Sequence, residues 1–341
     1  MQLRLTVGFS PNPRIRPLVD RTVTPQNIDL DFVCMHAAEL FNRNLRFEEF
    51  DVMEMSIACA LIAKERSEGA KWDWSALPVF LTKTFLWANL CVNGASGISQ
   101  IGDLRGKRVG VPDYCMDAVL WMSLLLKDFH NIEPKELTWY IGRSKELSHG
   151  VSLGLDRDPP SGVDLKWVGG GDTLEVMLEQ GLIDVAMLLP SARPDSAAMD
   201  TFGYTRLNAN PGIRKLIEDG GREILTRYYL KNKFVPPNHM VIVKNKVLRQ
   251  HPWVAMELYK AFQRSKGVAY ERARELEPTY RLFESNDLKE QAAIFGKDPF
   301  PLGIRANRQM LEAAFRGVLL QGLVKKRFQV EDLFYHSTLD T

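Results

Sequence analysis

The sequence predicts an α/β protein with two lobes and a cleft between them, and three observations lead to this prediction. First, its 341 residues are enough for two domains of ordinary size. Second, strand-like and helix-like hydrophobic patterns alternate along the first half of the chain, as in mostly parallel sheets covered by helices. Third, a central unit of about 100 residues, itself of domain size, stands between this part and a mostly helical C-terminal part.

The first part begins with alternating apolar and polar residues, which predict a half-buried strand over Gln2–Phe9. Two prolines within Ser10–Arg14 end this strand. The patterns that follow predict, in order, a strand at Ile28–Met35, a helix at His36–Phe47, a strand at Phe50–Ser56, a helix at Ile57–Ala63 and two strands within Leu77–Val92.

The central unit repeats the alternation of strands and helices. Its patterns predict strands at Arg108–Val111, Leu137–Ile141 and Leu182–Leu189, and helices at Ala118–Phe129 and Asp172–Gln180. The segment Ser144–Gly162 is polar and contains several prolines and glycines, so we expect it to form an exposed excursion.

The C-terminal part is predicted to be helical apart from a strand at Met240–Lys244. Apolar residues at helical spacing predict core-facing helices over Pro252–Arg274 and around Met310–Leu319. We therefore predict a discontinuous first domain, residues 1–95 plus 208–341, into which a second domain, residues 96–207, is inserted. Because ligands of open α/β sheets bind beyond the carboxyl ends of the strands, the cleft between the domains is the expected site.

Composition excludes several classes of protein. Forty-four Lys and Arg residues against 42 Asp and Glu residues leave a formal charge of +2, and no basic stripe indicates a nucleic-acid partner. No apolar run approaches the roughly 18 residues of a membrane span. The four cysteines lack C-x-x-C spacing, so we expect neither a zinc knot nor a disulfide framework. The first residues do not resemble a signal peptide, and we expect a reducing, cytoplasmic setting.

Common catalytic and cofactor motifs are missing from the sequence, which has no G-x-G-x-x-G, P-loop, G-x-S-x-G or H-E-x-x-H pattern. The residues that follow strands offer better candidates. Arg14 and Arg16 lie in a proline-stiffened loop and are suited to hold carboxylates, although a solvated basic loop is an equal alternative. Glu54 stands between two methionines in a strand that ends at Ser56, which implies a cationic partner or a place in the cleft.

Further candidates follow the strands of the central unit and precede the last strand. Tyr114 and Asp117 come after Arg108–Val111, where Asp117 alternatively caps the next helix, and Ser191 and Arg193 come after Leu182–Leu189. His239 follows two prolines and begins the last strand, so it is a candidate general acid or base. The other five histidines have simpler structural interpretations, and no spacing supports a metal site.

Several motifs resemble those of known families. Gly102–Pro112 and Leu178–Ala186 resemble signature segments of type II periplasmic-binding-protein-like folds. More narrowly, the chain is similar nearly end to end to the 4,5-dihydroxyphthalate decarboxylases. The motifs that carry this resemblance are Arg14–Leu18, Phe50–Ser56, Val109–Tyr114, His239, His251–Val254 with Lys260–Lys266, Asp298–Pro301, Asn307–Ala313 and Glu331–Phe334. The chain departs from the family's usual residues at Asp113–Ala118, at Leu302 and at Pro11 and Pro13.

The resemblance implies a cytoplasmic carboxy-lyase that removes CO2 from a hydroxylated, phthalate-like aromatic acid without a cofactor. Such a reaction requires an acid for the ring carbon, a base for the phenol and cations for the carboxylates. His239, Glu54 and Asp117 are the expected catalytic residues. The expected substrate-binding residues are Arg14, Arg16, Ser56, Thr82, Tyr114, Ser191 and Arg193.

Two alternatives remain open at this point. One is a solute-binding protein for a small aromatic or carboxylate anion, and the other is a carbon–carbon lyase similar to the futalosine-pathway enzymes built on the same scaffold. The expected partner is a small aromatic carboxylate substrate, with neither nucleic acid nor membrane involved. A homodimer is possible on this scaffold, and the sequence does not fix it.

Overall fold

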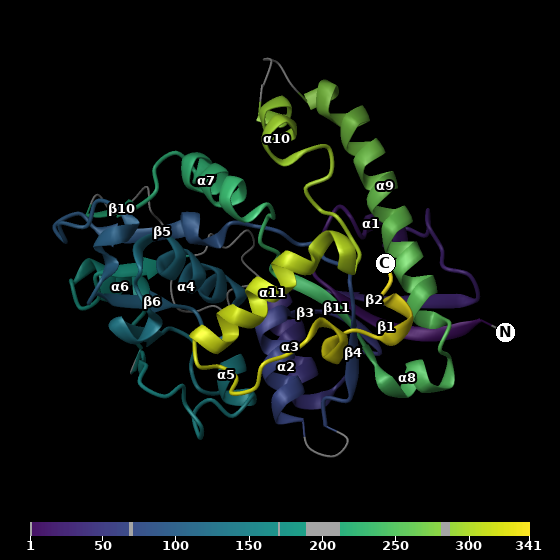
Figure 1. Ribbon diagram of the computed structural model, residues 1–341, viewed down its shortest axis with the longest axis horizontal. Coiled ribbons are helices and arrows are strands. Elements are labelled where there is room, and N and C mark those ends of the chain that lie inside the picture. Colours follow the sequence, from purple (N-terminus) through teal and green to yellow (C-terminus); the bar gives the residue numbers. More distant parts are fainter. Residues whose placement is uncertain (1, 68–70, 170, 189–211, 281–286) are drawn as a thin grey trace.

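A computed structural model of the protein describes residues 2–67, 71–169, 171–188, 212–280 and 287–341. These residues form two lobes, each built around its own sheet (Figure 1). The first sheet has the strand order β2-β1-β3-β11-β4. Its strands are β1 (Leu3–Phe9), β2 (Ile28–Cys34), β3 (Val52–Ser56), β4 (Trp74–Leu77) and β11 (His239–Lys244).

The second sheet has the order β10-β5-β9-β6-β7-β8. Its strands are β5 (Leu90–Asn93), β6 (Arg108–Val111), β7 (Thr138–Ile141), β8 (Asp164–Trp167), β9 (Val185–Met187) and β10 (Ile213–Lys215). The fold class agrees with the sequence prediction, but this sheet extends one strand beyond each predicted domain boundary. The two added strands, β5 and β10, pair with each other in antiparallel fashion, and this pairing places both of them in the second lobe.

Helices cover both sheets. In chain order they are α1 (Arg16–Val19), α2 (Ala37–Phe47), α3 (Ile57–Arg66), α4 (Asp117–His130), α5 (His149–Ser152), α6 (Leu174–Glu179), α7 (Arg222–Asn232), α8 (Asn245–Gln250), α9 (Val254–Tyr280), α10 (Asp287–Phe295), α11 (Ile304–Leu320) and α12 (Val330–Leu333). Short 3-10 turns occupy Leu86–Asn89, Ile101–Leu104, Pro134–Glu136 and His336–Thr338. No helix of the described residues is both long and apolar enough to span a bilayer.

A single hydrophobic core joins the two lobes. Helix α11 runs between them and packs against α3 of the first lobe and α4 of the second (Figure 1). Leu61, Leu120 and Leu311, one from each of these helices, are fully buried in the same apolar cluster. The two lobes therefore share one close-packed apolar cluster, in which a change of side-chain volume is felt by both.

Two parts of the chain differ from their sequence predictions. The segment Leu77–Val92, predicted to hold two strands, contains the end of β4, a 3-10 turn and the start of β5. The segment Ser144–Gly162, predicted to be an exposed excursion, turns inward at Ser148 and His149, which are fully buried. Its polar residues are buried because Asp113 accepts hydrogen bonds from both of them, a long-range partner that local composition does not reveal.

Two helical glycines allow a matched test of the shared core. A Cβ atom at Gly317 in α11 would lie 3.0 Å from Leu124 Cδ1 and 3.1 Å from Leu120 Cδ2, whereas one at Gly267 in α9 would meet nothing within 4 Å. We expect Gly317→Val to lower the free energy of unfolding by about 1–3 kcal/mol through overpacking. Gly267→Val should change it by less than about 0.5 kcal/mol. Equal effects in urea denaturation would contradict this account of the interface.

Candidate functional site

The site begins with an imidazole and a carboxylate on neighbouring strands. His239, the first residue of β11, lies opposite Ser56, the last residue of β3. Since side chains alternate along a strand, Glu54 shares the face of Ser56 and lies diagonally across from His239. The two groups meet at 2.7 Å between His239 Nδ1 and Glu54 Oε2. The pairing of β3 with β11 in the interior of the first sheet therefore brings two of the predicted catalytic residues into direct contact.

The surroundings of this pair favour its ionised form. Glu54 also accepts hydrogen bonds from the backbone N–H of Ser10, which follows β1, and from the Thr82 hydroxyl at 3.4 Å. Burial opposes the charge of the Glu54 carboxylate, but His239 and Ser10 outweigh it and the pKa of Glu54 is lowered. Burial likewise opposes the charge on His239, but Glu54, with help from Asp117, raises its pKa overall.

The imidazole remains accessible on one side. Its side chain is 16% exposed, whereas that of Glu54 is 2% exposed. The Phe41 ring packs edge-on against His239, with the ring centroids 4.9 Å apart and the planes at 86°. Because Nδ1 is engaged by Glu54 and the ring is fixed by Phe41, Nε2 is the atom of His239 that is left for a ligand.

Asp117 brings a second carboxylate to the site from the other lobe. It is the first residue of α4, and it accepts hydrogen bonds from the backbone N–H groups of Ile57 and Ala58 at 3.1 and 2.9 Å. Burial raises the pKa of Asp117 to about 7, although the charge of His239 and the Ala58 N–H act in the opposite direction. Near neutral pH this carboxyl group is able to exist in both protonation states, as a proton-transfer group must.

Ser56 lies two residues after Glu54 and forms a hydrogen bond with Asp117, so it connects the two carboxyl groups of the site. Its hydroxyl oxygen accepts a hydrogen bond from the Cys59 backbone N–H at 3.1 Å and thereby caps the start of α3. It also forms a hydrogen bond with Asp117 that lowers the pKa of that carboxyl group. Ser56 therefore positions Asp117 and the beginning of α3.

A buried polar network, which the sequence did not single out, lies behind Asp117. Asp113 accepts hydrogen bonds from the Ser148 hydroxyl at 3.0 Å and the His149 backbone N–H at 2.7 Å, and it lies 3.8 Å from Arg143. The Cys59 and Cys115 sulfur atoms are 3.8 Å apart. Their mutual hydrogen bond lowers the pKa of Cys59 and raises that of Cys115.

Only weak signals of this network are present in the sequence. Asp113 directly follows a strand and a proline, which is the position that marked the other candidates, but the cysteines stand in apolar surroundings typical of core residues. His149 lies in a polar segment, and only the fold shows that its Nε2 atom is 2.8 Å from the Ala38 carbonyl.

The arginine loop contributes one buried and one exposed cation. The Arg14 guanidinium lies over the Phe300 ring, 3.4 Å from its centroid, and donates to the Leu81 carbonyl at 3.3 Å. Burial lowers the pKa of Arg14. Its Nε atom is buried and has no hydrogen-bond partner among the described residues. Arg16, by contrast, is exposed at the start of α1, at the edge of the site.

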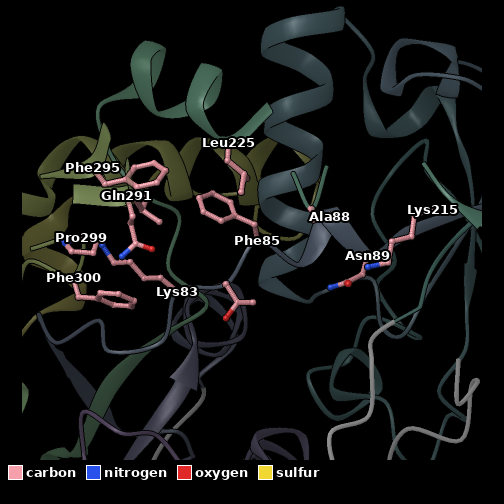
Figure 2. Close-up of a pocket in the computed structure, with 13 residues that line it drawn as sticks. Lys83, Phe85, Ala88, Asn89, Lys215, Leu225, Gln291, Phe295, Pro299 and Phe300 are labelled. Atoms are coloured by element: carbon pink, nitrogen blue, oxygen red, sulfur yellow. The ribbon is translucent and has the colours of Figure 1, made fainter. Parts of the chain in front are cut away.

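A cavity of about 390 Å³ adjoins this loop. Figure 2 shows Phe295, Phe300 and Lys83 around one end of it, and Lys215 with Asn89 at the other end. The remaining lining residues are Thr84, Phe85, Ala88, Gly220, Leu225, Val235, Gln291 and Pro299. Its volume lies within the range of about 300–1,000 Å³ that is usual for small-molecule sites.

Tyr114 lies apart from the group formed by the described candidates His239, Glu54, Asp117, Ser56, Thr82 and Arg14. The Tyr114 hydroxyl donates to the Gln321 carbonyl at 3.1 Å inside the core, and its ring packs against Trp139. This burial leaves Tyr114 without a surface for a substrate. Ser191 and Arg193 lie outside the described residues, so their predicted roles remain predictions.

The chemistry available to the described residues is that of proton transfer and anion binding. They contain a histidine–glutamate pair, a carboxyl group that titrates near neutrality and an adjoining cationic, aromatic cavity. No group of three or more His, Cys, Asp or Glu side chains among them is arranged to hold a metal ion.

Comparison with known sequences points to decarboxylases. No family model matches the chain. It is 26% identical over 342 residues to a curated 4,5-dihydroxyphthalate decarboxylase of Comamonas testosteroni, covering 100% of this chain and 98% of the relative. A curated protein of the same name from Pseudomonas putida is 28% identical over 186 residues, which cover 54% of this chain and 70% of the relative. These similarities support a relation to decarboxylases at a coarse level.

Comparison with solved structures identifies the fold. The aliphatic sulphonate binding protein SsuA of Escherichia coli superposes with a TM-score of 0.52 at 12% identity, covering 100% of both chains. A ligand-binding component of an ABC-type import system from Staphylococcus aureus gives 0.51 at 13%, covering 99% of this chain and 98% of that one. At such low sequence identity, these similarities support an assignment of the fold and not of a function. The chain therefore has the two-lobed periplasmic-binding-protein fold that its sequence predicted.

Proposed function

We propose that the protein is a cofactor-independent decarboxylase of a hydroxylated aromatic acid. The observation that carries this proposal is the His239–Glu54 pair, with 2.7 Å between its atoms, beside a second carboxyl group, Asp117, that titrates near neutral pH. Buried titratable groups with perturbed pKa values cluster at catalytic sites, which favours an enzyme over a protein that only binds an anion. The decarboxylases that the chain resembles at 26–28% identity support the same reaction class.

In the proposed reaction, protonated His239 gives its Nε2 proton to the ring carbon that bears the carboxylate. Asp117 takes the proton of a hydroxyl group ortho or para to that carbon, so the protonated ring becomes a neutral dienone. The bond to the carboxylate then breaks, its electron pair restores the aromatic ring, and CO2 leaves. The hydroxyl regains its proton from Asp117, and His239 regains from water the proton that it gave to the ring. The net change is the consumption of one proton and the replacement of the carboxylate by hydrogen.

Glu54 and Arg14 act on this reaction in different ways. Glu54 keeps His239 protonated and holds its ring in one orientation, since charge-assisted hydrogen bonds are short and strongly directional. Arg14 supplies a fixed positive charge beside the ring of Phe300, where an aromatic anion is favoured. Neither role requires an electron-accepting cofactor, because the ring itself accepts the electrons of the breaking bond.

The activity itself is the first test. We expect wild-type protein incubated with 4,5-dihydroxyphthalate or a related hydroxybenzoate to release CO2 and the corresponding phenol, measured by mass spectrometry. His239→Gln should lower kcat by about 100- to 10,000-fold, the usual contribution of a general acid. His336→Gln, which changes an exposed histidine in the C-terminal tail, is the matched control. Saturable binding of these acids with no CO2 after long incubation would support a solute-binding protein instead.

The pH profile tests the role of Glu54. Since His239 acts as the acid and its pKa is raised, activity should persist through neutral pH and fall as the pH rises through that raised pKa. Glu54→Gln removes the charge that raises the pKa, so the alkaline fall of kcat/KM should move to lower pH. Glu312→Gln, at an exposed position of α11, should leave the profile unchanged. An unshifted alkaline limb in Glu54→Gln, with a normal melting temperature, would refute this role.

A further inference from the structure

The 390 Å³ cavity carries an unbalanced positive charge. Its lining residues include Lys83 and Lys215 and contain neither aspartate nor glutamate. The aromatic rings of Phe85, Phe295 and Phe300 form much of the remaining surface. A cavity with this lining favours a ligand that combines an anionic group with a flat apolar body.

Lys83 is the cation whose charge is least compensated. No hydrogen bond or ion pair is formed by its ammonium group among the described residues, and its Nζ atom lies 5.8 Å from the centroid of the Phe300 ring. Burial lowers the pKa of Lys83 to about 7; the nearby Asp298 opposes this lowering, and Lys266 and Arg14 add to it. A bound anion would supply the partner that this ammonium group lacks.

The groups that face Lys83 cannot supply that partner. Asp298 is held by the Lys266 ammonium group, which belongs to α9, and by the Tyr270 hydroxyl at 3.1 Å. Arg14, from the loop before α1, is a like charge. Lys83 therefore remains the free cation at its end of the cavity among the described residues.

The chain links this end of the cavity to the proposed acid–base pair. Lys83 directly follows Thr82, whose hydroxyl donates to Glu54 at 3.4 Å. Both Arg14 and Lys83 approach the Phe300 ring, at 3.4 Å and 5.8 Å from its centroid. Thr82 therefore connects the Lys83 end of the cavity to the carboxylate that pairs with His239.

We propose that Lys83 binds a carboxylate of the ligand that is not lost in the reaction, and that the aromatic ring of the ligand packs among Phe85, Phe295 and Phe300. The identity of the ligand rests on the proposed function, but the binding role of Lys83 does not. A cation paired with the departing carboxylate would stabilise the substrate more than the transition state and slow the release of CO2. Lys83 is therefore a specificity-determining residue for a second carboxylate.

The binding test pairs an anion with its neutral counterpart. 3,4-Dihydroxybenzoate keeps one carboxylate and both hydroxyls of a dihydroxyphthalate, and 3,4-dihydroxybenzamide lacks the charge. We expect Lys83→Met to weaken benzoate binding about 10- to 100-fold in isothermal titration calorimetry and benzamide binding less than about 3-fold. Lys83→Arg should retain most of the preference for the anion. Equal losses for both ligands, or no loss for either, would overturn the proposal.

Lys215→Met provides the matched control for the general charge of the cavity. Lys215 is exposed and lies at the far end of the cavity in Figure 2, so water screens its charge. Its replacement should weaken benzoate binding less than about 3-fold. A loss equal to that of Lys83→Met would show that overall charge, and not contact with Lys83, attracts the anion.

Proton linkage gives an independent readout. An anion beside Lys83 favours the charged ammonium group, so binding at pH 7.5 should take up a proton and should weaken as the pH rises. Titrations in two buffers with different ionisation enthalpies measure this uptake, which should be smaller in Lys83→Met than in the wild type. The same uptake in both proteins would contradict the proposal.

These outcomes separate the two proposals of function and binding. Wild-type protein that releases no CO2 but binds the benzoate through Lys83 would refute the decarboxylase and leave the anion site intact. If the wild-type protein releases CO2 and Lys83→Met has the same KM, the decarboxylase would stand and the anion site at Lys83 would be refuted.

Discussion

The pairing of β11 with β3 is the constraint on which the site depends. These strands are about 180 residues apart in the chain, and their antiparallel register places His239 opposite Ser56 and diagonal to Glu54. A slip by one residue would turn His239 to the opposite face of the sheet. The apolar residues of β11 are buried on both faces, so a slip would also disturb two cores. The stability of the first lobe and the geometry of the acid–base pair are therefore set by the same hydrogen-bonded ladder.

The sequence predicted the parts of the fold that depend on local patterns. The strand β1 and the helix α2 follow from periodicity within a single segment, and the structure has them within one residue of the predicted bounds. The helix α11 was predicted around Met310–Leu319 and begins earlier, at Ile304. Glu54 and His239 were identifiable because each has an unusual local setting, one within an apolar strand and one after two prolines. Their contact was not, since the register of strands so far apart depends on the packing of the whole lobe.

The residues that the sequence analysis missed share a physical cause. Asp113 and His149 are both buried because the His149 backbone N–H donates a hydrogen bond to Asp113, 36 residues away in the chain. Lys83 is notable only because the nearby carboxylate of Asp298 is already paired with Lys266. Composition gives Ser144–Gly162 the character of an exposed loop, yet one buried carboxylate is enough to draw Ser148 and His149 inward. Unpaired or mutually paired buried polar groups are properties of the assembled structure, and so sequence patterns of single segments do not reveal them.

The charged residues of the site fall into two regions. At the strand ends, the His239–Glu54 pair and Asp117 combine one cationic group with two carboxyl groups, whereas Lys83 and Lys215 in the lining of the adjoining cavity, with Arg14 beside Phe300, make that cavity positive. Fixed cations favour the binding of a dianionic acid before reaction more than that of the monoanion left after it. Loss of one carboxylate as CO2 removes one negative charge and weakens this attraction. In the proposed reaction, this arrangement would favour both capture of the substrate and release of the product, because the cation pairs with the carboxylate that remains and the reacting carboxylate loses its charge into the ring.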